Sequence, residues 1–225
     1  MSNRMALIVI IALILGAFLS GVLLWERLPA QMASHWSAAD EVDGYLPRFW
    51  GVFLTPLISL GVAALFLVLP LIDPLRENVA RFRRMFNLFI VILIAFLLYL
   101  HLLTLVYNLG VTSCLIRLML PAMAVLIFFA GELMRQAKRN WFIGIRTPWT
   151  LSDDRVWAKT HHLGSILFKA TAGVILLSVF LPGSRFGVVL GALLLAAFVP
   201  LGYSYWLFER YRKEGLVAQP TEENG

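Results

Sequence analysis

The side chains best suited to binding chemistry lie in residues 140–162, a stretch rich in tryptophan, glycine and proline. Arg146 lies two residues after Gly144 and directly before Thr147-Pro148. A guanidinium can hold a phosphate or a carboxylate with two parallel hydrogen bonds, which a lysine cannot reproduce. The proline restricts the neighbouring backbone and would fix the direction of the Arg146 side chain. We therefore predict that Arg146 and Thr147 bind a phosphate, a lipid headgroup or a protein partner.

A structural interpretation of the same stretch stays open beside the binding one. Ser152 is a suitable N-cap for a helix, with Asp153 and Asp154 in the first turn. The pattern that follows is amphipathic, which is typical of an interfacial helix leading into a membrane span. One predicted face carries Val156, Trp157 and Thr160, and the opposite face carries Arg155, Lys159 and His162. The tryptophans that would anchor the stretch at headgroup level are Trp141, Trp149 and Trp157.

A second unusual stretch, residues 26–49, holds the most acidic part of the chain. Its carboxylates are those of Asp40, Glu41 and Asp43. Asp43-Gly44 predicts a tight turn, because glycine takes a positive φ without steric cost. We interpret the stretch as a folded cap whose aromatic residues lie at headgroup level. His35, Trp36, Asp43 and Gly44 are its candidate contacts for a partner.

The histidines offer little for metal binding. His161 and His162 are adjacent, and adjacent residues point about 100° apart on a helix, so their rings do not easily share one ion. His35 lies near three carboxylates and could bind a cation or sense pH. His101 lies inside an apolar stretch, where an ionisable group is a functional candidate, the alternative being a neutral imidazole bonded to a neighbouring helix. We predict no metal site and no cofactor.

These stretches are set in a chain with the composition of a membrane protein. Hydrophobic residues make up 60% of the sequence and charged residues 14%, with a mean hydropathy of +0.81. A soluble domain is usually about a quarter charged, so this chain could not maintain a water-facing surface. The net charge of +6 lies in short clusters between apolar runs, which is typical of membrane loops and not of direct nucleic-acid binding. The single cysteine, Cys114, excludes an intrachain disulfide framework.

Six apolar stretches are long enough to cross a bilayer as helices. We predict one all-α, polytopic membrane domain over residues 1–225, with spans at 5–25, 50–72, 86–109, 111–134, 165–181 and 186–208. The first span is too long for the apolar region of a cleaved signal peptide, so we expect a retained anchor. The main connections are an outer loop at 26–49 and a cytoplasmic signature loop at 135–164. A tail at 209–225 follows, and we expect disorder beyond Leu216.

The distribution of lysine and arginine predicts the orientation, because cytoplasmic segments retain positive charge. With the N-terminus inside, fourteen of these residues lie in inner segments and four in outer segments. Lys169 lies about one turn inside the fifth span, and its side chain would extend to the inner surface. We predict that both termini and the loop around Arg146 are cytoplasmic, and that the loop around His35 is outside.

The stretch around Arg146 resembles the signature of the SdpI family of bacterial membrane proteins. That family shows a G-[IL]-R-T-P-W-T-L core followed by an acidic pair and V-W. The matching residues here are Gly144, Ile145, Arg146, Thr147, Pro148, Trp149, Thr150 and Leu151, with Val156 and Trp157 after them. The first loop resembles the short domain of unknown function that often precedes the signature, through Leu28, Pro29, His35, Trp36, Asp43, Gly44 and Tyr45. It departs from that pattern at Ala33, Ser37 and Asp40, where proline, asparagine and glycine are usual.

The resemblance implies an immunity protein in the bacterial cell membrane that confers resistance to a secreted antimicrobial peptide. It also implies a second role, as a receptor that holds a small cytoplasmic repressor at the membrane. The expected partners are then the bilayer, a peptide toxin outside and a repressor inside. The candidate inner contacts are Gly144, Arg146, Thr147, Pro148, Trp149, Thr150 and Trp157, and the outer ones are those of the first loop.

Two other functions are compatible with a polytopic chain. A transporter or channel would be favoured by an inverted repeat or by paired broken helices, and the sequence shows neither. An intramembrane enzyme needs a catalytic group within a span, and only His101 qualifies. The sequence has no H-E-x-x-H or G-x-S-x-G motif and no intramembrane aspartate pair. We therefore predict no catalytic residue and no enzymatic activity.

Overall fold

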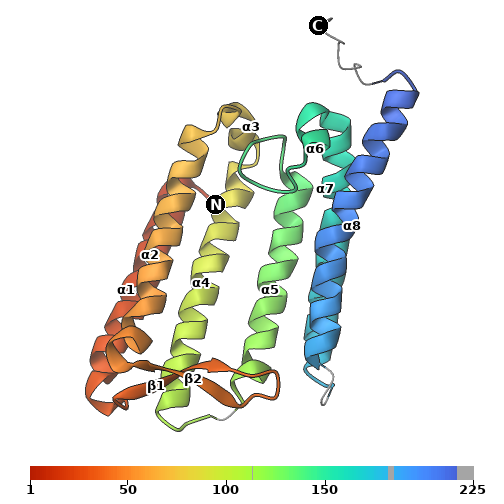
Figure 1. The fold of residues 1–225 in the computed structure, drawn as a ribbon. Helices are drawn as coiled ribbons and strands as arrows, with labels where there is room; N and C mark the ends of the chain where they lie inside the picture. Colours follow the sequence, from red (N-terminus) through yellow and green to blue (C-terminus); the bar gives the residue numbers. More distant parts are fainter. Residues whose placement is uncertain (113, 182–184, 217–225) are drawn as a thin grey trace, which may run out of the picture.

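Six long helices run side by side in the computed structural model, which describes residues 1–112, 114–181 and 185–216 (Figure 1). They are α1 (Asn3–Leu24), α2 (Arg48–Ile72), α4 (Arg83–Asn108), α5 (Leu115–Gln136), α7 (Asp154–Ser178) and α8 (Arg185–Lys213). A two-stranded sheet lies at one end of the bundle, which we call the hairpin end. The opposite end of the bundle, which we call the signature end, carries the predicted signature loop. In the structure this loop is limited to residues 137–153, because α5 ends at Gln136 and α7 begins at Asp154, and the name is used for this range from here on. The tail predicted to be disordered beyond Leu216 lies outside the described residues.

The helices form two groups of three. Helices α1, α2 and α4 contact one another, and α7 lies between α5 and α8 in the second group. The groups meet where α4 packs against α5, and we call this boundary the seam. A short 3-10 helix η1 (Trp25–Arg27) ends α1, and α3 (Arg76–Arg81) connects α2 to α4. Neither short element was predicted, since each is too brief to produce a periodic pattern.

Large apolar side chains cover the outer surfaces of the helices. Ile8 and Leu15 of α1 and Phe198 of α8 are each more than 60% exposed. A soluble monomer does not carry apolar patches of this extent, whereas acyl chains cover them at no cost. Five helices among the described residues are long and apolar enough to cross a membrane: α1 with η1, α2, α4, α5 and α8. The sixth long helix, α7, has a polar first half, and it lies alongside the others within the bundle.

Residues 31–47 of the predicted outer loop form a β-hairpin, which the all-α prediction omitted. Strand β1 (Gln31–Trp36) pairs antiparallel with β2 (Val42–Pro47). The predicted turn at Asp43-Gly44 is wrong, because both residues lie within β2 and the chain reverses at residues 37–41 instead. Asp40 takes the left-handed conformation there, with φ 66°. Gly44 is required for packing, since a Cβ at this position would lie 2.9 Å from the Cβ of His35 on β1.

The predicted interfacial helix and fifth span form a single continuous helix. The N-cap of α7 is Asp153 and not Ser152, which ends the short helix α6 (Pro148–Ser152). The two predicted faces are confirmed, because Val156, Trp157 and Thr160 are buried while the three basic or imidazole side chains opposite are exposed. Trp157 is only 2% exposed, so its indole packs within the chain and does not form the exposed membrane anchor that was predicted. The fourth span also begins later than predicted, at Leu115.

Candidate functional site

Asn140 shapes the first half of the signature loop. Its side chain is fully buried. The Nδ2 group donates to the carbonyl oxygens of Lys138 and Ile143 at 2.8 and 3.0 Å, and Oδ1 accepts from the amides of Phe142 and Ile143 at 3.0 and 2.6 Å. One buried amide thus satisfies four backbone groups of a tight turn, as buried polar groups require. No local sequence pattern indicates this role of Asn140.

Gly144 brings the loop backbone against His161 of α7. Its φ is 103°, and a Cβ here would overlap Nε2 of His161, so the position admits only glycine without rearrangement. The next amide, that of Ile145, donates to the same Nε2 at 2.9 Å. On the other side of the ring, Nδ1 donates to the carbonyl of Trp157 at 2.9 Å. The imidazole also stacks on the indole of Trp157, with ring centroids 3.9 Å apart. One ring nitrogen of His161 accepts a hydrogen bond and the other donates one, so the imidazole is neutral when it holds the loop.

Burial makes that neutral form the stable one. His161 lies at the signature end, before the apolar stretch 165–181, and it is 2% exposed. Burial lowers the pKa of its imidazole from 6.5 to about 4, since a charged ring would lose its hydration. Both ring nitrogens are already used within the chain, so His161 is a structural residue and not a metal ligand. No group of three or more potential metal ligands lies together among the described residues.

The Thr-Pro-Trp-Thr part of the signature forms the capped helix α6. Thr147 accepts from the Thr150 amide at 3.1 Å, and the Thr150 hydroxyl oxygen accepts from the Thr147 amide at 2.9 Å, which is a capping box. Pro148 occupies the first helical position, where its missing N–H costs nothing. Trp149 packs on Tyr205 of α8, with ring centroids 5.0 Å apart. Four of the candidate contacts therefore have structural tasks.

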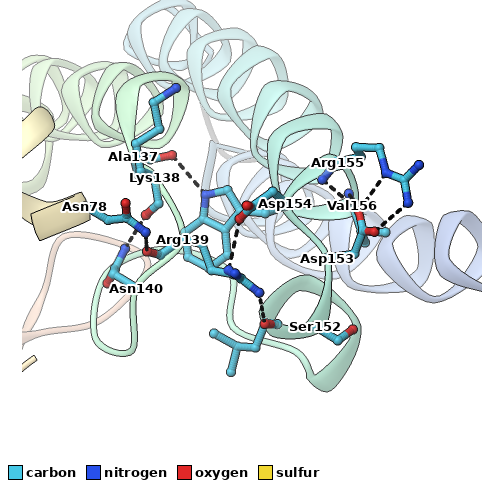
Figure 2. A network of polar contacts seen from close by, with 12 residues as sticks. Asn78, Ala137, Lys138, Arg139, Asn140, Ser152, Asp153, Asp154, Arg155 and Val156 are labelled. Carbon is cyan, nitrogen blue, oxygen red and sulfur yellow. Dashed lines mark hydrogen bonds and ion pairs between the residues drawn. The ribbon is translucent and has the colours of Figure 1, made fainter. Parts of the chain in front are cut away.

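The acidic pair after the signature closes the loop onto α7 (Figure 2). Asp153 accepts from the amides of Arg155 and Val156 at 2.7 and 3.1 Å. The Arg155 guanidinium, 2.8 Å away, bonds to the same carboxylate and, with those amides, lowers its pKa. Asp154 pairs with Arg139 across the loop, with Oδ1 2.9 Å from Nε, and Arg139 also donates to the Leu151 carbonyl at 2.9 Å.

The signature loop is also fixed to the first helix group, across the seam. The carboxylate of Asp73, at the end of α2, accepts from the Trp141 amide at 3.0 Å and is 3% exposed. Asn78 of α3 donates to the Arg139 carbonyl at 2.9 Å. Ile143 packs into the same apolar cluster as Phe86 of α4. The prediction from sequence did not join these distant segments, because no local pattern connects residue 73 to residue 141.

Arg146 is the signature residue whose polar atoms are least used. Its side chain is exposed, and Nη1 donates to the Trp141 carbonyl at 2.8 Å. The other guanidinium nitrogens have no partner among residues 1–112, 114–181 and 185–216. Trp141 is 50% exposed beside it. This pair is therefore what the ordered loop presents at its surface.

At the hairpin end, Asn108 of α4 fixes the hairpin to the bundle. Its Oδ1 accepts from the Ala33 amide at 2.8 Å, and its Nδ2 donates to the Ala33 carbonyl at 3.0 Å, so the side chain acts as one more strand residue. Trp36 meets Tyr107 edge to face, with ring centroids 5.0 Å apart. Asp40 accepts from the Ile116 amide at 3.1 Å and thereby reaches α5. The hairpin thus contacts both helix groups.

The outer candidates lie over an apolar cavity. His35 and Asp43 face each other across the strands at 2.5 Å and are largely exposed. Beneath the hairpin, a cavity of about 360 Å³ is lined by residues 34–38, by α5 and by α8. Its apolar walls include Met119, Met123, Phe186, Leu190 and Leu193. A hairpin rich in carboxylates therefore covers an opening that suits apolar side chains.

Two ionisable side chains within the predicted spans are directed at neighbouring helices. His101 is 1% exposed in α4, and its ring is directed at the backbone of Ala17 on the neighbouring helix α1, although the contact lacks ideal hydrogen-bond geometry. Lys169 pairs with a carboxylate of another helix, a contact that the sequence did not predict. Its Nζ lies 2.6 Å from the carboxylate of Glu132 on α5, and the pair joins α5 to α7. No sequence pattern connects Glu132 to Lys169, because the two residues lie on different helices.

These features define a mostly helical, multi-pass membrane protein with a folded structure at each end of its bundle. Residues 136–204 match the SdpI/YfhL protein family, and residues 8–60 match a domain of unknown function, DUF1648. The chain is 24% identical over 192 residues, 85% of its length, to 90% of the immunity protein SdpI of Bacillus subtilis (strain 168). The resemblance to the SdpI family and to the domain preceding it is thereby confirmed. No solved structure matches the chain.

Proposed function

We propose that this chain is a membrane immunity protein that protects a bacterium from a secreted peptide toxin. The similarity to the immunity protein SdpI carries this proposal, because it extends over 85% of this chain and 90% of that relative. The two family matches, at residues 8–60 and 136–204, contain the hairpin and the signature loop. The similarity therefore concerns the whole architecture and not a single motif.

The hairpin end is the proposed site at which the toxin is met. Residues 28–47 contain three carboxylates and no lysine or arginine. A cationic amphipathic peptide would place its basic side chains near Asp40, Glu41 and Asp43. Its apolar side chains would enter the cavity of about 360 Å³ beneath the hairpin. Opposite charge would guide the encounter, and apolar burial would hold the complex.

The signature end is the proposed site of a second role, the retention of a small cytoplasmic repressor. Arg146 and Trp141 are exposed on a loop whose backbone is held by Asn140, His161 and Asp73. Arginine and tryptophan are the residues most often found at binding hot spots. A rigid loop also loses little entropy when a partner binds.

The orientation that this proposal needs places both termini and the signature end in the cytoplasm, with the hairpin outside. Ala39 and Ser152 are exposed at opposite ends of the bundle. Single cysteines at these positions, in a Cys114→Ser background, are labelled in intact cells with a reagent that cannot cross membranes. We expect labelling at position 39 only. Labelling of both positions from the same side would contradict the orientation.

A survival assay tests the immunity function itself. Sensitive cells that produce this chain are exposed to the secreted peptides of the bacterium that encodes it, and cells with an empty vector are the control. We expect the inhibitory concentration of one such peptide to rise at least tenfold. If no peptide shows a shift while the chain is present in the membrane, the immunity function is refuted.

A further inference from the structure

A second cavity, of about 280 Å³, lies at the signature end on the seam between the two helix groups. Its walls come from α3, from the end of α5 with the start of the signature loop, and from α7. The side chains that give it charge are Arg81, Arg135, Lys138, Arg139 and Asp154. Trp157 and His161, each 2% exposed, form its floor. Four cations thus surround a concave site that holds one carboxylate.

Two of these cations lack a counter-charge. Arg135 pairs with Glu132 at 2.6 Å, and Arg139 pairs with Asp154 at 2.9 Å. Arg81 and Lys138 form no ion pair within the described residues. The imidazole in the floor is neutral, so it adds no charge to the cavity. Both of its nitrogens bond to backbone groups, so neither is available to a ligand. The cavity therefore carries an excess of positive charge.

The Arg139 guanidinium is held in place as a binding group. It is 29% exposed, and Nη1 is fixed by the Leu151 carbonyl at 2.9 Å. Its contact with Asp154 is close in distance, but the Nε–H does not point at the carboxylate as in a hydrogen bond. Asp154 itself is 74% exposed, and an ion pair with a solvated partner contributes little. Figure 2 shows Arg139 and Asp154 facing each other near Asn78. An entering anion can replace this carboxylate.

We propose that this cavity binds a phosphate group. Planar guanidinium groups and a mobile ammonium group are the usual ligands of phosphate, and two unpaired cations match its charge. The cavity lies where α5 ends at Gln136, which is the level of lipid headgroups if α5 crosses the bilayer. Basic pockets between membrane helices bind phosphate-bearing headgroups. The same chemistry accepts a phosphate from an anionic lipid or from a soluble compound, and the bound group would bridge the two helix groups.

Native mass spectrometry of the purified full chain in detergent tests this proposal. The probes are short-chain phosphatidylglycerol, phosphatidylcholine of the same chain length, and inorganic phosphate. The cavity variant is Arg81→Gln/Lys138→Gln, which removes the charges of two exposed side chains. The matched control is Lys159→Gln/Lys213→Gln, which removes two exposed charges at the same end but outside the cavity. Thermal melting of each variant confirms that it is folded.

We expect the parent to retain phosphatidylglycerol in preference to phosphatidylcholine, and the cavity variant to bind it at least tenfold more weakly. The control variant should stay within twofold of the parent. Asp154→Asn should tighten binding severalfold, because it removes the competing carboxylate. If inorganic phosphate instead shows this dependence and the lipid does not, the ligand is a soluble phosphate. Equal losses in the cavity and control variants, or no loss for any probe, would overturn the proposal.

Discussion

At the scale of single residues, the residues of the signature loop have two different tasks. Gly144, Thr147 and Thr150 use their backbone freedom or their polar atoms inside the loop, and His161 of α7 holds the loop through its Nε2. Arg146, by contrast, donates one hydrogen bond to the Trp141 carbonyl through Nη1, and its other guanidinium nitrogens face solvent. The first set keeps the loop in one conformation, and the second is free to contact another molecule.

Gly144→Ala should open the loop. The left-handed backbone and the overlap with Nε2 of His161 together cost about 2 kcal/mol. Hydrogen exchange of residues 140–147, measured on the purified chain, should accelerate accordingly. Gly173→Ala is the matched control, because a Cβ at Gly173 in α7 meets nothing within 4 Å. Equal exchange in both variants would show that Gly144 is not needed for the loop conformation.

The stability of the signature loop should depend on pH through His161. An opened loop would expose the imidazole at its ordinary pKa of 6.5, whereas burial lowers the pKa to about 4 in the closed loop. The open state then binds a proton more readily, so stability is full above pH 6.5 and falls by up to about 3 kcal/mol as the pH drops to about 4. Hydrogen exchange near Ile145, corrected for the intrinsic rate, should show this loss. A His161→Gln variant with the same pH dependence as the parent would exclude His161 as its source.

Arg146→Lys separates a binding role from a topological one. Lysine keeps the positive charge but cannot form two parallel hydrogen bonds to one anion. We expect the affinity for a cytoplasmic repressor to fall at least tenfold, about 1.4 kcal/mol, at matched membrane abundance. Arg76→Lys, on an exposed position of α3, should leave that affinity unchanged. An unchanged Arg146→Lys protein, beside an Arg146→Ala protein that fails to insert correctly, would make the charge a topological signal.

At the scale of elements, the hairpin depends on one side chain from α4. Asn108 makes two hydrogen bonds to Ala33, and its removal leaves both backbone groups without a partner. Asn108→Ala should therefore destabilise the hairpin by about 2 kcal/mol, seen as faster hydrogen exchange in residues 31–47. Asn78→Ala removes a comparable amide at the signature end and should leave the hairpin unchanged. Equal effects of the two variants on the hairpin would indicate general loosening of the bundle.

The sequence predicted the long helices well and the small elements poorly. Apolar length alone marks a membrane helix, so the positions of α1, α2, α4 and α8 agree with the predicted spans within a few residues. The hairpin was missed because Asp43-Gly44 is a local turn signal, while the need for Gly44 arises from His35 on the other strand. Asn140, His161 and Asp73 were likewise missed as loop partners. Their contacts are with backbone groups, and backbone groups leave no trace in residue type.

At the scale of the whole molecule, both ends cross the seam between the helix groups. The hairpin bonds to α4 through Asn108 and to α5 through Asp40. The signature loop bonds to Asp73 after α2 and packs on Tyr205 of α8 through Trp149. A relative movement of the two groups would therefore be felt at both ends. Under the proposed function, these contacts would connect a peptide at one end to a partner at the other.

The central claim is that a secreted peptide meets the hairpin end, and photo-crosslinking in intact cells tests it directly. A photo-reactive phenylalanine analogue replaces Ala38, an exposed residue that lines the cavity, or Trp141, which is 50% exposed at the signature end. The peptide found in the survival assay is then added from outside and irradiated. We expect an adduct from position 38 and none from position 141. An adduct from position 141 alone, or equal adducts from both, would contradict the account.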